Sequence, residues 1–303
     1  MSLYHTPVLL QESLDALVTN PSGTYIDATF GGGGHTAGIL SRLNKSGRVI
    51  AFDRDIDALG NRPEDDRLTL VHNNFRFIEN YVRHLGLPRV DGILADLGVS
   101  SHQFDTAGRG FSFRFDAPLD MRMNTQGTLT AATLVNTCPE EQLEQILRLW
   151  GEVDNPRRAA RLIVAARDKA PIETTGQLEA ALTPMLPAHA AHKVLAKVFQ
   201  ALRIEVNQEM RSLEKFLEGA AKVLSPGGRL AVITYHSLED RMVKNFIRTG
   251  NIAGETVKDF YGNIEAPLKA AIKKPIVPAE AEIAANTRAR SAKLRVAEKE
   301  ADA

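Results

Sequence analysis

The segment 25–36, YIDATFGGGGHT, constrains the fold of this chain more than any other. A short apolar run leads into four consecutive glycines, and the residues that follow, TAGILSRL, have a helical pattern. Glycine allows a sharp turn and a close approach of the backbone to a ligand. A strand that turns into a helix also leaves free N–H groups at the helix N-terminus, where polar or anionic ligand groups bind. The segment therefore predicts the start of an α/β fold that binds a nucleotide-like cofactor.

The first third of the chain alternates short apolar strands with helical patterns, which predicts a parallel sheet with crossover helices. The expected strands are 25–28, 48–52, 68–72 and 92–95. Between about Phe104 and Leu202 the alternation gives way to a loop rich in arginine and aromatic residues and then to alanine-rich helical sequence. It returns with a helix over 206–224, a strand over 229–235 and a last strand within SAKLRVAE. We expect a discontinuous Rossmann-like domain, 1–105 and 203–303, with an all-helical insert at 106–202.

Two features bear on which cofactor this fold binds. Residues 32–37 formally match the dinucleotide pattern G-x-G-x-x-A, but that match alone is weak. The glycines follow Asp27 in a D-x-x-x-G-x-G arrangement that resembles the first motif of S-adenosylmethionine-dependent methyltransferases, with Thr29 where their first glycine usually stands. The sequence LSPGGRL at 224–230 opens a late strand and resembles a methyltransferase feature that has no role in dehydrogenases. Together they favour S-adenosylmethionine over NAD.

Acidic and aromatic side chains stand at the ends of the expected strands. Asp53 ends the second strand, about 20 residues beyond the glycines, where an acidic side chain accepts the ribose hydroxyls of either cofactor. Phe75 follows the third strand and Asp96 ends the fourth. Taken alone, either acid could be a helix cap or loop residue, and Phe75 could belong to the core. Their shared position at strand C-termini favours a cofactor site, with Phe75 against adenine.

The composition sets limits on the class of protein. Lys and Arg number 37, as do Asp and Glu, so any nucleic-acid-binding surface must be local. A single cysteine, Cys138, excludes an intramolecular disulfide and fits a reducing compartment. The N-terminus lacks the features of a signal peptide, and no run approaches the roughly 18 apolar residues of a membrane span. We therefore expect a cytoplasmic protein without a membrane partner.

Several long segments resemble the MraW/RsmH family of ribosomal RNA methyltransferases. The segments are HTPVLLQE at 5–12, DATFGGGGHT at 27–36, DGILADLGVSSHQFD at 91–105, RGFSFRFDAPLDMRM at 109–123, FQALRIEVNQEM at 199–210, LSPGGRLAVITYHSLEDRMVK at 224–244 and NTRARSAKLRVAE at 286–298. The resemblance covers nearly the whole chain and is much more specific than a glycine motif. It is weakest over 129–192 and 250–280, so it describes the insert less fully than the cofactor pocket.

The resemblance implies methylation of the N4 amine of a cytidine in 16S rRNA, at the decoding centre of the small ribosomal subunit. It implies S-adenosylmethionine as the methyl donor. It also implies a set of cofactor-binding residues, each of which matches in this chain: Gly33, Gly34, His35, Asp53, Phe75, Asp96 and Gln103.

The chemistry of this reaction suggests two catalytic candidates. The lone pair of the cytosine amine is delocalised into the ring, so catalysis needs in-line placement and an acceptor for an amine N–H, without a metal. Asp96 and the loop after it lie where amino-methyltransferases hold the amine, although DLGVSS differs from their usual Asp/Asn-Pro-Pro-aromatic form. We assign Asp96 first to the cofactor and second to catalysis. His236 could orient the base or take a proton, or could simply cap the next helix. The histidines show no spacing typical of metal ligands.

Basic residues in the predicted insert are candidates for RNA contact. They are Arg109, Arg114 and Arg122, which lie among phenylalanines, and Arg157 and Arg158 on a predicted helix. Arginines and aromatic rings together suit phosphate contact and base stacking. A charge run is more often a solvated surface, and this alternative stays open for each cluster.

Three other functions compete with the leading one. The fold alone allows a methyltransferase acting on DNA or protein. A non-catalytic RNA-binding assembly factor could keep the same fold, although the intact glycine loop, Asp53 and Asp96 argue against a decayed site. An NAD-dependent oxidoreductase is the least consistent with the PGG turn. The sequence leaves open whether the protein is a monomer or a homodimer.

Overall fold

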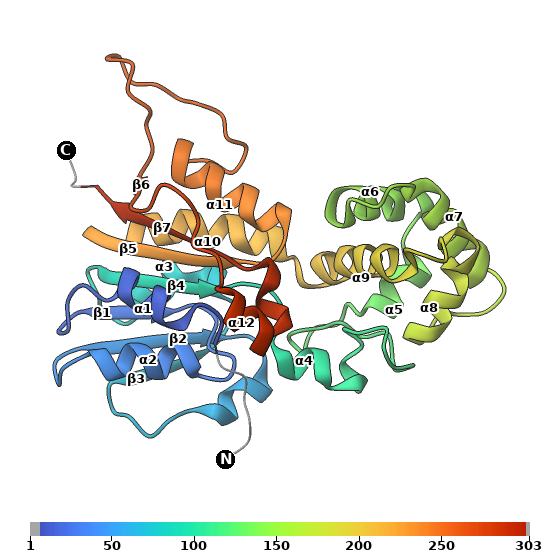
Figure 1. Ribbon diagram of the computed structural model, residues 1–303, viewed down its shortest axis with the longest axis horizontal. Coiled ribbons are helices and arrows are strands. Elements are labelled where there is room, and N and C mark those ends of the chain that lie inside the picture. Colours follow the sequence, from blue (N-terminus) through green and yellow to red (C-terminus); the bar gives the residue numbers. More distant parts are fainter. Residues whose placement is uncertain (1–6, 301–303) are drawn as a thin grey trace. The chain divides into compact units, whose positions relative to one another are not determined.

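The computed structural model describes residues 7–300, which divide into two compact units (Figure 1). One unit combines the described parts of Met1–Gly98 and Met210–Ala303, and the other is Val99–Glu209. No helix in the described range has the length and hydropathy of a membrane span.

The first unit is built on a seven-stranded sheet of order β3-β2-β1-β4-β5-β7-β6. The strands are β1 Thr24–Asp27, β2 Arg48–Asp53, β3 Leu68–His72, β4 Val90–Asp96, β5 Leu224–Thr234, β6 Leu268–Ala270 and β7 Lys293–Lys299. The first five strands are parallel, and β7 is antiparallel to both β5 and β6. The carboxyl ends of the parallel strands therefore share one edge, as the sequence predicted. The Rossmann-like fold class is confirmed.

Helices cover both faces of this sheet (Figure 1). They are α1 Leu10–Leu17, α2 Gly34–Arg42, α3 Ile78–His84, α10 Glu209–Val223, α11 Ser237–Thr249 and α12 Glu280–Ala285. Side chains alternate between the two faces of each strand. In β2, Ile50 and Phe52 join the core under α3, α10 and α11. Val49 and Ala51 of the same strand join the core under α1 and α2. Both faces are apolar, which explains why these strands are nearly continuous hydrophobic runs.

The second unit is helical and has its own core. Its helices are α4 Ser101–Asp105, α5 Ala131–Thr137, α6 Glu140–Gly151, α7 Pro156–Arg167, α8 Thr175–Leu182 and α9 Ala191–Asn207. Their apolar faces form one cluster around Leu147, Ile163 and Leu202. The predicted insert, 106–202, lies inside this unit.

Three local features differ from the sequence prediction. The helix expected over 206–224 is divided, because Gln208 adopts a left-handed conformation with φ 49° between α9 and α10. The strand expected over 229–235 begins earlier, at Leu224, and the pairing with β4 shifts register around the Pro-Gly-Gly turn. The short strand β6 was not predicted, because Leu-Lys-Ala carries no alternation to detect.

Candidate cofactor and catalytic site

The loop after β1 is tied to its surroundings by the polar side chains of Asp27 and Thr29. Asp27 is fully buried, and its carboxylate accepts hydrogen bonds from Thr36 Oγ1 at 2.7 Å and from the Thr29 backbone N–H at 3.1 Å. The Thr29 hydroxyl in turn accepts from the Asp96 backbone N–H at 2.7 Å. Thr29 therefore links the ends of β1 and β4, which gives a physical reason for a threonine where the usual motif has glycine.

Two of the glycines have distinct roles in starting α2. Gly33 precedes the helix with φ 77°, a left-handed conformation that L side chains rarely adopt. A Cβ on Gly34 would lie 2.2 Å from Cγ of Pro7, so this position has no room for a side chain. No side chain among residues 7–300 caps the helix, which leaves the first N–H groups of α2 open to a ligand.

Asp53 ends β2 beside the glycine loop. Its Oδ2 accepts from the Gly31 backbone N–H at 2.7 Å, and its Oδ1 accepts from the Asp55 N–H at 2.8 Å. Burial raises the pKa of Asp53, although these two hydrogen bonds act in the opposite direction. A carboxylate oxygen has more than one lone-pair direction, so each oxygen keeps acceptor capacity for a hydroxyl group.

Asp96 lies at the end of β4, and its carboxylate has two polar neighbours. Its Oδ1 accepts from the Tyr235 hydroxyl at 2.7 Å, and its Oδ2 lies 3.8 Å from Nδ1 of the buried His35. Burial raises the pKa of Asp96 to about 6, against the lowering influence of His35 and Tyr235. Burial also raises the pKa of Tyr235 well above its usual value, so the phenol stays a donor.

The segment after β5 holds this tyrosine in place. Glu239, in the first turn of α11, is buried, and its Oε2 accepts from the Tyr235 backbone N–H at 2.9 Å. Its Oε1 lies 3.1 Å from Nε2 of His236. His236 occupies the N-cap position of α11, but its side chain makes no capping hydrogen bond. The alternative that His236 acts only as a helix cap therefore loses its support, while a catalytic role is still a proposal.

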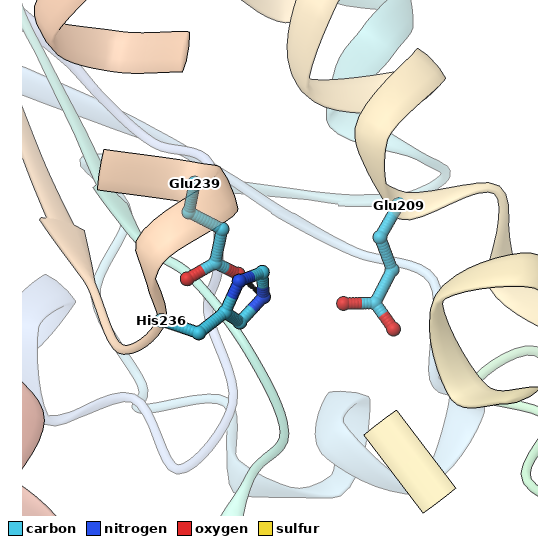
Figure 2. A group of neighbouring side chains, drawn as sticks. All are labelled: Glu209, His236 and Glu239. Atoms are coloured by element: carbon cyan, nitrogen blue, oxygen red, sulfur yellow. Dashed lines mark ion pairs between the residues drawn. The ribbon is translucent and has the colours of Figure 1, made fainter. Parts of the chain in front are cut away.

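Figure 2 draws Glu209 with His236 and Glu239, three side chains of kinds that bind metal ions. Only His236 and Glu239 belong to the same unit. The Glu209 carboxylate accepts from Nε and a terminal nitrogen of Arg203 at 2.8 and 2.9 Å, so its charge is already compensated. The prediction that this protein needs no metal stays a prediction.

Two further predicted cofactor residues have structural contacts of their own. Phe75 is half-buried at the end of β3, and its ring packs edge-on against Phe216, with centroids 5.1 Å apart. Gln103 is buried in α4 of the helical unit, where its Oε1 accepts from the Ser100 N–H and the Ser100 hydroxyl accepts from its own N–H. This reciprocal capping box fixes the start of α4. The roles of both residues toward the cofactor are proposals.

The arginines predicted to contact RNA differ in exposure. Arg109 is buried, and its guanidinium donates to the carbonyls of Arg122 and Met123 at 3.0 and 3.1 Å. Arg122 forms a two-pronged ion pair with Asp120, at 2.8 and 2.6 Å. These two arginines stabilise their own loop, and we do not propose them as RNA contacts. A charge pattern in a sequence does not distinguish such internal pairing from an open surface.

The remaining three arginines are exposed. Arg114 and Arg157 form no ion pair with any residue in the described range. Arg158 donates to the Pro184 carbonyl at 2.6 Å, a neutral acceptor that leaves the charge of Arg158 uncompensated. The neighbouring Arg161, by contrast, pairs with Glu140. Arg114, Arg157 and Arg158 therefore stay candidates for RNA contact.

Comparison with known proteins identifies the family. A model of the MraW methylase family matches residues 2–300. This chain belongs to the MraW methylase family. Proteins named "Ribosomal RNA small subunit methyltransferase H" from Bacteroides fragilis and Bacteroides thetaiotaomicron are each 55% identical to it, over 98% of this chain and 97% of theirs. The protein of that name from Flavobacterium johnsoniae is 53% identical, over 98% of both chains.

Membership of the MraW methylase family confirms the resemblance seen in the sequence, and with it the enzyme class and S-adenosylmethionine as methyl donor. Among solved structures, an rRNA methylase from Streptococcus thermophilus is 13% identical, over 96% of this chain and 93% of that one. The TM-score of the two structures is 0.42.

Four residues that the sequence prediction did not assign to the site help to build it: Thr29, Thr36, Tyr235 and Glu239. The hydrogen bond from the Asp96 N–H to Thr29 joins residues 67 positions apart, and the one from the Tyr235 hydroxyl to Asp96 joins residues 139 positions apart. The only local signal for Tyr235 and Glu239 was their place beside His236 in the segment YHSLED.

Proposed function

We propose that this enzyme transfers a methyl group from S-adenosylmethionine to the N4 amine of a cytidine in 16S rRNA, at the decoding centre of the small ribosomal subunit. The names of its relatives support rRNA of the small subunit as the substrate. The observation that carries the chemistry is the placement of Asp96, a half-buried carboxylate of raised pKa beside the glycine loop. Such groups are typical of active sites.

The residues around the sheet edge fit the methyl donor. We infer that the open N–H groups after Gly33 and Gly34 bind its polar groups, that Asp53 accepts its ribose hydroxyls and that Phe75 packs against its adenine. His35, Asp96 and Gln103 complete the proposed set. When bound, S-adenosylmethionine supplies a methyl group on a positively charged sulfur, which is already a strong electrophile.

The task left to the protein is to orient the amine and accept a proton. As the N–C bond forms and the S–C bond breaks, one amine proton has to leave. Asp96 is ionised above its pKa of about 6 and could accept a hydrogen bond from the amine N–H that loses this proton. His236 is the second candidate for the proton acceptor. We assign Asp96 first to cofactor binding and second to catalysis, because its contacts with His35 and Thr29 join it to the glycine loop.

We propose that the helical unit recognises the substrate through Arg114, Arg157 and Arg158. Arginine is suited to phosphate groups because its planar fork donates two hydrogen bonds at once. The target base must leave its stack to reach the methyl donor, which requires contacts that hold the surrounding RNA. The proposed partner is the small subunit in the cytoplasm.

Small ribosomal subunits from cells that lack this activity provide the test. They are incubated with the protein and labelled S-adenosylmethionine, and the RNA is digested and analysed by mass spectrometry. N4-methylated cytidine is the expected product. Methylation of DNA or protein alone would contradict the proposed substrate, and cofactor binding without transfer to any of them would favour the assembly factor.

Two variants test the proposed catalytic residues. Asp96→Ala is expected to weaken cofactor binding as well as turnover, and normal affinity with lost turnover would reverse our assignment. His236→Ala is expected to lower turnover with unchanged cofactor affinity. His84→Ala, an exposed histidine of α3 in the same unit, is the matched control. If His236→Ala turns over like this control, the catalytic role of His236 is excluded.

A further inference from the structure

A hairpin between α11 and β6 carries two solvent-exposed aromatic rings at its tip. Phe260 is 98% exposed and Tyr261 is 86% exposed, the highest values among the large hydrophobic residues that the structure describes. Their segment, residues 257–265, lies in the long loop that rises from the sheet between these two elements (Figure 1). We refer to it as the aromatic hairpin. Neither the cofactor site nor the proposed catalytic residues include it.

Several hydrogen bonds hold the aromatic hairpin in a defined shape. Lys258 and Ile264 form an antiparallel bridge, and the Asp259 N–H donates to the Asn263 carbonyl at 2.9 Å. The Asp259 carboxylate then accepts from the backbone N–H groups of Tyr261 and Asn263, both at 2.8 Å, and from the Asn263 side chain at 3.0 Å. The turn is therefore stabilised by its own hydrogen bonds, while both rings stay exposed to solvent.

We propose that Phe260 and Tyr261 stack on unpaired bases of the ribosomal RNA substrate, an inference that rests on the proposed function. The two rings lie 5.6 Å apart with planes at 86° in an edge-to-face contact, which leaves at least one face of each ring open to solvent. Unpaired bases bind proteins by stacking on such open aromatic faces. Lys258 adds an exposed positive charge next to the rings and forms no ion pair with any described residue, as a contact to a neighbouring phosphate requires.

The size of the aromatic hairpin favours RNA over a protein partner. A stable protein interface needs about 800 Å² from each side, whereas an aromatic side chain buries roughly 150–250 Å². Two rings, together with the exposed Val257 and Ile264 of the stem, do not supply a docking surface of that size. Two stacked bases, by contrast, need only two rings and a nearby cation.

Three double variants separate base stacking from apolar contact. Phe260→Ala/Tyr261→Ala removes the rings, Phe260→Leu/Tyr261→Leu keeps apolar side chains without planar faces, and Phe260→Trp/Tyr261→Trp keeps the faces. The measurements are the Kd for small ribosomal subunits by filter binding, the KM and kcat of methyl transfer, and the Kd for S-adenosylmethionine. Filter binding tests the aromatic hairpin even if methyl transfer to these subunits fails.

We expect both the alanine and the leucine variants to raise the Kd and KM for subunits at least about thirty-fold, with kcat and cofactor affinity unchanged, and the tryptophan variant to match the wild type. Wild-type subunit affinity in the alanine variant would overturn the proposal. So would a leucine variant that binds like the wild type beside a weakened alanine variant, because apolar contact would then suffice. A wild-type protein that binds subunits without transferring a methyl group would contradict the proposed function alone.

Discussion

Replacing Asp96 by asparagine is expected to stabilise the folded enzyme at pH 8. The pKa of Asp96 is about 6 in the folded protein against an ordinary value of 3.8, and burial is the main cause. A carboxyl group with a raised pKa stabilises the fold below its unfolded pKa and loses that contribution as the pH rises through the folded value. At neutral and alkaline pH the wild type therefore carries a half-buried carboxylate that opposes folding.

The size of this effect follows from the pKa shift. About 2.2 units at 1.36 kcal/mol per unit give roughly 3 kcal/mol at pH 8, and the same relation gives about 1.6 kcal/mol at pH 5. Asparagine keeps an oxygen that accepts from the Tyr235 hydroxyl, while its new amide group costs about 1 kcal/mol at either pH if it finds no partner. The gain in unfolding free energy should therefore be about 1.4 kcal/mol larger at pH 8 than at pH 5, whatever the amide group costs.

Urea unfolding of wild type and Asp96→Asn at both pH values measures this difference. The control is Asp240→Asn. Burial raises the pKa of Asp240, but the hydrogen bonds and charge of Arg295 lower it further, so that the net pKa is below its ordinary value. Ionised Asp240 thus stabilises the fold fully at any pH well above its ordinary pKa of 3.8. Its replacement should therefore destabilise the protein equally at pH 5 and pH 8. A stability change in Asp96→Asn that is negative at pH 8, or equal at both pH values, would refute the reasoning.

Three other variants probe the same edge of the sheet. Tyr235→Phe removes a donor to the ionised Asp96, so the pH at half-maximal S-adenosylmethionine binding should rise by about one unit in calorimetric titrations; an unchanged midpoint would contradict this. Gly34→Ala places a Cβ 2.2 Å from Pro7 Cγ and should lower the free energy of unfolding by about 1–3 kcal/mol, with weaker cofactor binding. Thr29→Val leaves the Asp96 N–H without its acceptor and should cost about 1–3 kcal/mol, whereas Thr29→Ser should be close to wild type; equal losses in both would point to packing instead.

The cofactor side of the site could be predicted from the sequence because its signals are local. Asp53 and Asp96 each end an apolar strand, and parallel strands bring such ends to one edge. The glycine run marks the turn into α2 in the same way. The supporting residues Thr29 and Tyr235 escaped prediction, because their role exists only after β1, β4 and β5 are paired.

The substrate side was less predictable for a related reason. Arg109 and Arg114 look alike in the sequence, yet one is buried against backbone carbonyls and the other is exposed. Charge patterns report which groups are present and not which are already paired. The exposed rings of Phe260 and Tyr261 were not singled out either, since aromatic residues are core residues more often than surface ones.

The arrangement around Asp96 is costly for the fold, and this is itself an argument for function. Three residues from two segments converge on the end of β4: Thr29 of segment 25–36 on its backbone, and His35 of the same segment and Tyr235 on its carboxylate. Tyr235 is in turn held by the buried Glu239, which adds a second acidic group to the same region and raises the pKa of Asp96 further. An apolar residue at this strand end would avoid the burial of an acid. A carboxylate that is half-buried, contacted by two neighbours and opposed to stability is best explained by the methyl donor and the amine that it has to meet.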